Sequence, residues 1–442
     1  MIIIGNGPVI TRDEIKPYYT NGAVVIEGTE ITEVGPFEKV RSKYPESDII
    51  DAKGKVIMPG FINGHTHIYS AFARGLHLKG PVPQNFIETL KSLWWKIDHH
   101  LSLEEVYYSA LVTYIECIKN GVTTVIDHHA SYGSVVGSLF EIEKVAQKLH
   151  VRTCLAYEIS DREGSEKTRE AIEENIAFIA YAKAMASDMV KGLIGLHASF
   201  TLSDETLAQV RKENVFGAGY HIHIAEGRYD AGFSKERYGK SVVRRLFDEE
   251  ILGKDTLAGH CIHIDKEDRK LLKETKTTVI HNPESNMNNA VGAPDIIGML
   301  DEGLRVGLGT DGYTNDMLES LKVANILQKH QRGLPNRGFD EACRCLFQHN
   351  SEMASKVFEC PIGILKQGAK ADLIMMDYTP YTPMTAENIN GHLMFGMQGT
   401  MTDTTIINGQ IVMLHRQIMG IDEKELLAAC RQQVAAFWKR LD

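Results

Sequence analysis

The sequence predicts an α/β protein in which a (β/α)8 TIM barrel carries a small β-sandwich domain built from both chain ends. Three observations lead to this prediction. Apolar runs alternate with longer charged segments of helical period through the middle of the 442-residue chain. Short strands and turns fill the beginning of the chain, and the same texture returns late. Histidines repeatedly follow the apolar runs, where barrel strands place active-site residues.

The β-sandwich domain is predicted from its strand and turn signals. Four short strands are expected early in the chain, over 1–4, 22–27, 30–35 and 48–51. A late strand over 371–376 precedes Asn408-Gly409, a strong hairpin signal between two apolar runs. We therefore expect residues 1–54 and 362–420 to form one composite domain around the barrel. A last helix over 421–442 is expected to pack on the outside.

The barrel is predicted from eight apolar runs, each followed by a helical segment. The expected strands lie at 56–63, 122–126, 151–157, 192–196, 219–224, 256–260, 277–281 and 304–309. Eight alternations between residues 55 and 361 fit a closed barrel better than an open sheet. A doubly wound open sheet is the alternative.

Composition and charge exclude several classes of protein. A hydrophobic share of 43% and a charged share of 24% are ordinary for a soluble globular enzyme. The net charge of −10, without a basic block, argues against a nucleic-acid surface. No apolar stretch approaches the length of a membrane span, which argues against a membrane partner. Seven scattered cysteines are typical of a reducing compartment, so we expect a cytoplasmic protein.

Polar residues that follow the predicted strands form the candidate site. In chain order they are His65 and His67, Asp127-His128-His129, Tyr157-Glu158, His197, His223 with Glu226, His260, His281 and Asp311. Because the carboxyl ends of barrel strands meet at one end of the barrel, we expect these side chains to converge.

The residue types at these positions indicate a metal site. Residues i and i+2 of a strand point the same way, so His65 and His67 can bind one ion. His223 and the carboxylate of Asp311 complete a nitrogen and oxygen ligand set for one divalent ion, Zn²⁺ first and Fe²⁺ second. His221 is the alternative ligand, but the spacing to Glu226 favours His223. Such an ion lowers the pKa of its water to about 7.

The remaining residues predict the chemistry. Glu226 lies three residues beyond His223 and can carry a proton from the water to a substrate nitrogen. His260 can orient the attacking oxygen, and Asp311 can act as ligand and proton acceptor. The predicted fourth strand has no lysine at its far end to bridge a second metal, which indicates a mononuclear site. The chain also lacks the Pro-Cys-x-x-Cys of the cysteine-ligated nucleobase deaminases.

Several of these motifs resemble the amidohydrolase superfamily, in the branch with guanine and S-adenosylhomocysteine deaminases and triazine hydrolases. The first is Pro-Gly-Phe-Ile-Asn-Gly-His-Thr-His, followed by Arg74-Gly75-Leu76. Residues 259–263, 281–286 and 307–312 resemble the branch's sixth-, seventh- and eighth-strand signatures. Residues 368–373 and Asn408-Gly409 resemble its β domain, so the similarity spans essentially the whole chain.

By position, the resemblance implies His65, His67, His223 and Asp311 as ligands, and Glu226 and His260 as catalytic residues. It also implies His197 as a substrate contact, and it places Asp98 where adenosine-type members hold a ribose-binding acid. Members that hold an amino-acid carboxylate place an arginine on strand three, where this chain has Tyr157. We therefore expect a smaller heterocycle than S-adenosylhomocysteine. Further candidate contacts are Arg74, His281 and either His128 or His129.

The predicted function is a metal-dependent aminohydrolase that deaminates a purine- or pterin-like heterocycle and releases ammonia. Ring opening of a cyclic amide, or dechlorination, on the same mononuclear site is the alternative. A non-catalytic assembly protein with a decayed fold is a third hypothesis, but decay would have erased the ligands. The resemblance also implies a homo-oligomer, expected to be a dimer.

Overall fold

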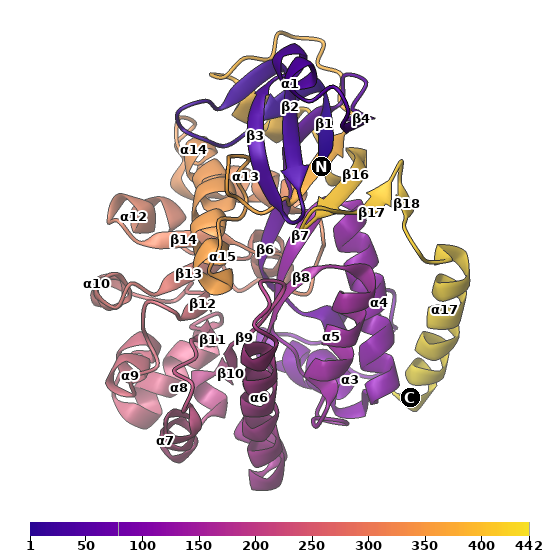
Figure 1. Cartoon of the computed structure of the whole chain (residues 1–442). Coiled ribbons are helices and arrows are strands. Elements are labelled where there is room, and N and C mark those ends of the chain that lie inside the picture. The colour runs from indigo at the N-terminus through magenta and orange to yellow at the C-terminus, as the bar shows by residue number, and fades with distance from the viewer. Residues whose placement is uncertain (78, 442) are drawn as a thin grey trace.

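A barrel of parallel strands and a β-rich domain make up the protein in the computed structural model, which describes residues 1–77 and 79–441. Figure 1 shows the β-rich domain above the barrel, with the indigo start of the chain beside yellow strands from its end. Both chain ends therefore contribute to one domain, as predicted.

The β-rich domain is one nine-stranded sheet in the order β18-β17-β16-β15-β5-β1-β2-β3, with β4 paired to β1. Leu373 pairs with Ile406 on one side and with Pro59 on the other, which joins the two chain ends. The predicted sandwich is thus a single continuous sheet. Its strands are β1 (Ile2–Ile10), β2 (Tyr18–Glu27), β3 (Glu30–Pro36), β4 (Asp48–Asp51), β5 (Val56–Pro59), β15 (Leu373–Met376), β16 (Thr402–Ile407), β17 (Gln410–Leu414) and β18 (Gln417–Ile418).

The run predicted as the first barrel strand, 56–63, is two strands. Its first half is β5, which, among the described residues, pairs with β1 and β15 of the β-rich sheet and with no barrel strand. Its second half is β6 (Phe61–Thr66), which begins the barrel. The change of sheet falls at Gly60, where a Cβ atom would lie 2.2 Å from Cγ2 of Thr123. The boundary predicted after residue 54 therefore leaves one β-domain strand on the wrong side.

The barrel is closed, although its strands fall into two parallel sheets. The first sheet holds β6, β7 (Val122–Asp127), β8 (Arg152–Leu155) and β9 (Val190–Gly192). The second holds β10 (Ile194–Ala198), β11 (Tyr220–Ile224), β12 (Leu257–His260), β13 (Thr278–His281) and β14 (Arg305–Leu308). The fourth predicted strand is split at Leu193 into β9 and β10. Backbone hydrogen bonds cross both seams, from His197 to Ile159 and from Asp311 to His65, each 2.9 Å. The open-sheet alternative is wrong.

Helices follow the strands and cover the barrel (Figure 1). The longer ones include α4 (Leu103–Lys119), which begins with a capping box between Ser102 and Glu105, and α6 (Ser165–Met185). The others are α1 (Phe37–Lys43), α2 (Phe86–Thr89), α3 (Trp95–His100), α5 (Ser138–Leu149), α7 (Asp204–Glu213), α8 (Arg228–Tyr238), α9 (Val242–Asp248), α10 (Lys266–Glu274), α11 (Pro283–Asn288), α12 (Ile296–Asp301), α13 (Met317–Arg332), α14 (Phe339–Cys343), α15 (Asn350–Phe358) and α16 (Ile389–Phe395).

The expected C-terminal helix is present as α17 (Glu423–Arg440), which is N-capped by Asp422. It lies along the outside of the barrel beside α4 (Figure 1), and Arg440 forms a 2.6 Å ion pair with Glu105 at the start of α4. Asp442, the last residue of the predicted range, lies outside the described residues.

A buried ion pair joins the barrel to the β-rich domain. Arg152 on β8 donates to both carboxylate oxygens of Asp372, at 2.9 and 3.2 Å, and neither side chain is exposed. Asp372 also accepts the backbone N–H of Asn408 at 2.7 Å. Asp372 and Asn408, which belong to the late sequence motifs, therefore help to hold the barrel and the β-rich domain together.

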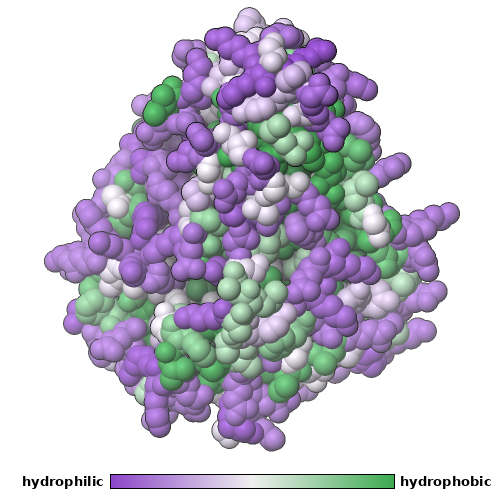
Figure 2. Space-filling view, viewed as in Figure 1, coloured by the Kyte–Doolittle hydropathy of each residue, from purple (hydrophilic) through white to green (hydrophobic). Residues whose placement is uncertain are grey.

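The surface seen in Figure 2 is mostly hydrophilic, with hydrophobic residues gathered below the β-rich domain and in small groups among the helices. Within the described ranges, no helix combines the length and the apolar character that a membrane crossing requires.

Candidate metal centre

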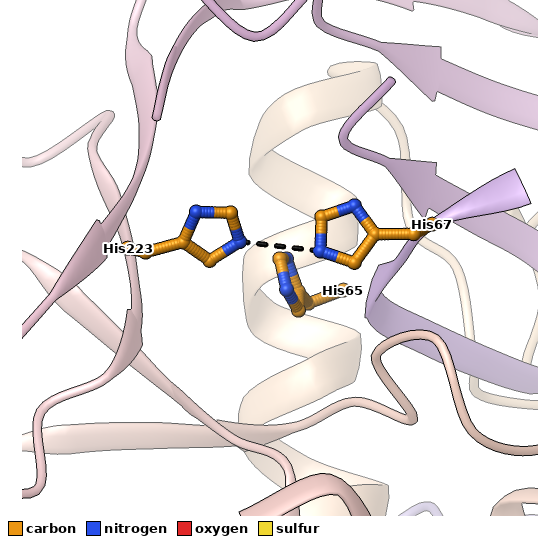
Figure 3. A group of neighbouring side chains, drawn as sticks. All are labelled: His65, His67 and His223. Atoms are coloured by element: carbon orange, nitrogen blue, oxygen red, sulfur yellow. Dashed lines mark hydrogen bonds between the residues drawn. The ribbon is translucent and has the colours of Figure 1, made fainter. Parts of the chain in front are cut away.

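Three imidazoles converge at the carboxyl ends of the barrel strands. His65 and His67 come from the end of β6, and His223 comes from β11 (Figure 3). Their ligand nitrogens all lie within 4.8 Å of one another, and the Nε2 atoms of His67 and His223 are 3.2 Å apart. Two nitrogens that share a tetrahedral Zn²⁺, each about 2.0–2.1 Å from it, have a similar separation. The three rings therefore fit one metal ion.

Hydrogen bonds determine which ring nitrogens of His65, His67 and His223 are free to bind an ion. His67 donates from Nδ1 to the carbonyl of His128 at 2.5 Å, and His223 donates from Nδ1 to the carbonyl of His197 at 2.9 Å. Because a carbonyl only accepts, both Nε2 atoms keep their lone pairs. Nδ1 of His65 lies 2.8 Å from Nε2 of His221, and Nε2 of His65 is buried without a partner among the described residues. A metal ligand requires such a nitrogen, because its lone pair is not taken up by a hydrogen bond.

Asp311 supplies a carboxylate to the same space. Its Oδ1 lies 3.2 Å from Nε2 of His67, and its Oδ2 accepts a 2.8 Å hydrogen bond from Ser285. Burial by itself raises the pKa of Asp311, but His67, His260 and Ser285 outweigh it, so the net pKa lies below its usual value. The residue has a φ of 56°, a strained backbone conformation that is common at functional sites. Asp311 thus offers an ionised carboxylate beside the three imidazoles.

Glu226 and His260 lie at the edge of this ligand set. Nε2 of His260 is 3.5 Å from both Glu226 Oε2 and Asp311 Oδ2, while its Nδ1 is 2.8 Å from the side-chain amide of Asn286. Burial, and then the charge of Asp311, raise the pKa of Glu226 well above its usual value. A carboxyl group with a raised pKa exchanges a proton more readily near neutral pH, which suits Glu226 to general acid–base catalysis.

A cavity of about 610 Å³ opens beside the ligands. His67, His223, Asp311 and Glu226 line it together with a set of aromatic residues: Tyr69, Phe86, Trp94, Trp95, Phe200, Tyr229 and Tyr313. Flat apolar walls around a few polar groups suit a planar heterocycle. The neighbouring residues Trp94 and Trp95 both contribute to these walls.

Of the six predicted substrate contacts, His197 is the one that lines this cavity within the described part of the chain. Tyr157 is fully buried, and its hydroxyl accepts the backbone N–H of Ser131. Asp98 is buried in an ion pair with Arg162. The geometry thus does not support Tyr157 and Asp98 as contacts, because each points to a partner within the protein.

The other three predicted contacts also lie away from the cavity. Arg74 is an exposed side chain that pairs with Glu116 on α4. His281 is buried behind the site, and His128 packs with its ring centre 4.6 Å from that of His223. His129 is buried too, with Nε2 2.9 Å from the Ser131 hydroxyl. Neither member of the His128-His129 pair lines the cavity, which corrects the expectation that one would.

Three further residues of the candidate site were given no role from the sequence or, for His221, a different one. Glu158 lines the cavity, Ser285 holds Asp311, and His221 supports His65. The alternation of side chains along a strand offered a signal for Glu158, since it faces away from its buried neighbour Tyr157. Ser285 belongs to the His281-Asn282-Pro283 motif, but only the fold brings it to Asp311.

Residues 56–412 match the model of the amidohydrolase family, and residues 22–46 match an imidazolonepropionase-like composite domain of bacteria. The chain belongs to the amidohydrolase family. The predicted hydrolase class is therefore confirmed, and the ligand set of this amidohydrolase supports a divalent metal ion.

Curated relatives extend over nearly the whole amidohydrolase chain. A 5'-deoxyadenosine deaminase of Methanosarcina mazei is 32% identical over 96% of this chain and 96% of its own length. A 5-methylthioadenosine/S-adenosylhomocysteine deaminase of Pelotomaculum thermopropionicum is 31% identical over 98% of each chain. The prediction of an enzyme that deaminates an amino-substituted heterocycle agrees with these relatives.

Solved structures share the fold of this amidohydrolase. An adenosine deaminase of Xanthomonas campestris with bound zinc superposes with a TM-score of 0.87 at 19% identity, covering 99% of this chain and 98% of the other. A zinc complex of an atrazine chlorohydrolase mutant from Arthrobacter aurescens gives 0.84 at 20% identity, covering 98% and 100%. The predicted barrel with its β-rich domain is thus a known arrangement.

Proposed function

We propose that this protein is a zinc-dependent deaminase that hydrolyses the exocyclic amine of an aminopurine and releases ammonia. One observation carries the proposal. Glu226 and His260 lie within 3.5 Å of each other at the edge of the three-histidine and Asp311 ligand set, inside an aromatic cavity. The named deaminase relatives support an adenine-like ring over a pterin.

The residues of the site divide the reaction between them. A bound Zn²⁺ would supply an activated water at neutral pH. His260 and Asp311 orient this water toward the ring carbon that bears the amine. Glu226 takes a proton from the water and gives it to the adjacent ring nitrogen as the C–O bond forms. A second proton reaches the amine through the same carboxyl groups, the C–N bond breaks, and ammonia leaves.

A substrate screen tests this proposal. Zinc-quantified protein is incubated with adenine, adenosine, 5'-deoxyadenosine, guanine and a set of aminopterins, and ammonia is measured. We expect ammonia from at least one aminopurine, with a matching change in ultraviolet absorbance. Release of a carboxylate or of chloride from other ring compounds, without ammonia from any amine, would instead favour ring opening or dechlorination.

We further propose that the enzyme is a cytoplasmic homodimer. Its seven cysteines are all free, and six of them are buried, which suits a reducing compartment. Light scattering after size-exclusion chromatography tests the dimer, since a mass near the 49.4 kDa of one chain would contradict it.

A further inference from the structure

Glu158 presents a buried carboxylate to the cavity. It lies three residues beyond the end of β8, lines the same cavity as Glu226, and is 3% exposed. Its oxygens lie 3.7 Å from Nε2 of His197, 3.7 Å from Nδ1 of His128 and 3.9 Å from Arg162. All three distances exceed that of a hydrogen bond. Within the described residues the carboxylate therefore has charged or polar neighbours but no hydrogen bond of its own.

His197 presents a second hydrogen-bond acceptor opposite Glu158. Nδ1 of His197 is 2.7 Å from the hydroxyl of Thr201, which itself donates to the carbonyl of Ala198 at 3.0 Å. Since the hydroxyl proton is used in that bond, Thr201 accepts from Nδ1, and the lone pair of His197 is on Nε2. A carboxylate oxygen and an imidazole nitrogen thus oppose each other at 3.7 Å. A donor placed between them can reach both at about 2.8–2.9 Å.

Asp98 cannot fill the same role. Its carboxylate pairs with Arg162, whose guanidinium lies over the rings of Tyr132 and Trp95 at 4.4 and 5.1 Å. Asp98 is fully buried and does not line the cavity. Asp98 is therefore engaged by Arg162 away from the cavity, whereas Glu158 lines the cavity and its carboxylate makes no hydrogen bond among the described residues.

We propose that Glu158 is a specificity-determining residue that, together with Nε2 of His197, receives a hydrogen-bond donor of the substrate other than the amine that leaves. The donor is a second ring amine or a sugar hydroxyl. A phosphate or carboxylate at this position is disfavoured because its oxygens are acceptors, as is Nε2 of His197. This proposal rests on the proposed deaminase function and narrows its substrate class.

Two substrate pairs separate the two sources of the donor. Adenine against 2,6-diaminopurine adds a ring amine, and 2',3'-dideoxyadenosine against adenosine adds sugar hydroxyls. In the wild type we expect one of these pairs to show a higher kcat/KM for the compound that carries the added donor, either 2,6-diaminopurine or adenosine. Glu158→Gln is expected to lower that preference about 10- to 100-fold, mainly through KM, since an acceptor oxygen that receives the substrate donor is replaced by an amide nitrogen. Glu158→Asp, which keeps the carboxyl group but retracts it, should lower it as well.

The controls make each outcome decisive. Glu143→Gln removes a buried carboxylate on α5 that contacts Gln147, outside the cavity, and should leave both preferences unchanged. Zinc content and melting temperature are measured for every variant. Unchanged preferences in Glu158→Gln would overturn the proposal. So would two zinc ions per wild-type chain that fall to one in this variant, because Glu158 would then be a metal ligand. If the wild type deaminates no compound, the proposed function itself fails.

Discussion

Nδ1 of His65 lies 2.8 Å from Nε2 of His221, and both rings are fully buried. His221 was the alternative ligand on β11, two residues from His223. The structure instead places it behind His65, a proposed ligand, where it holds the His65 ring with Nε2 toward the proposed metal site. An outer hydrogen bond of this kind orients a ligand and raises its basicity.

Replacing His221 should weaken metal binding without removing a ligand. We expect His221→Asn to lower zinc affinity about 10- to 100-fold, because His65 loses its orienting partner. Competition with a chromophoric chelator measures this affinity. The matched control is His129→Asn, which changes another fully buried histidine, whose ring is hydrogen-bonded to Ser131 among the described residues. An equal loss of affinity in both variants would indicate general destabilisation and contradict the orienting role.

Replacing Glu226 should stop the chemistry and spare the metal. Glu226→Gln keeps the size of the side chain but cannot carry a proton, so kcat is expected to fall about 10²- to 10⁴-fold. Zinc content should stay at that of the wild type, since Glu226 is not one of the ligands. Steady-state kinetics on metal-quantified protein provides the measurement. Full turnover in this variant would show that another group transfers the proton.

Metal analysis tests whether the centre is mononuclear. We expect one divalent ion per chain, and its removal by a chelator should abolish activity and lower the melting temperature, because binding stabilises the folded state. Zinc added back should restore both. Two tightly bound ions per chain in the active enzyme would contradict the predicted ligand set.

The Arg152–Asp372 ion pair should contribute strongly to stability. Asp372→Asn leaves the Arg152 guanidinium buried without its counter-charge, and such losses cost about 3–5 kcal/mol. A lower denaturation midpoint is the expected result. Glu173→Gln, which breaks the exposed Arg169–Glu173 pair on α6, should change the midpoint little. Equal effects would show that burial of the pair is unimportant.

Stability should also depend on the ionisation of Asp230. Burial raises its pKa to about 7, although the backbone N–H groups of Ala225 and Phe200 donate to it. The unfolded chain loses this proton near pH 4, as an ordinary aspartate does, so the folded state loses up to about 4 kcal/mol as the pH rises from about 4 through 7. The melting temperature of the wild type minus that of Asp230→Asn should therefore decline between pH 5 and pH 8. A difference that grows with pH would contradict this.

The convergence of the candidate ligands was predictable because they are carried by strand ends. His65, His67, His223 and Asp311 follow apolar runs whose carboxyl ends must meet in a barrel, so local pattern and topology were sufficient to bring them together. Substrate contacts were not predictable, because they depend on tertiary partners. Asp98 occupies the position that the resemblance implies, but its carboxylate forms an ion pair with Arg162. Tyr157 contacts Ser131, whereas its neighbour Glu158 faces the cavity. The change of sheet at Gly60 was also not predicted, because the single apolar run over 56–63 contributes strands to two sheets.

Isotope-labelled water tests the central claim most directly. Zinc-loaded wild type and Glu226→Gln are incubated in water enriched in ¹⁸O with the best aminopurine from the screen. The deaminase account predicts one ¹⁸O atom at the carbon that held the amine, one ammonia per product, and almost no turnover in the variant. Product without ammonia, without ¹⁸O, or formed at the wild-type rate by Glu226→Gln would contradict it.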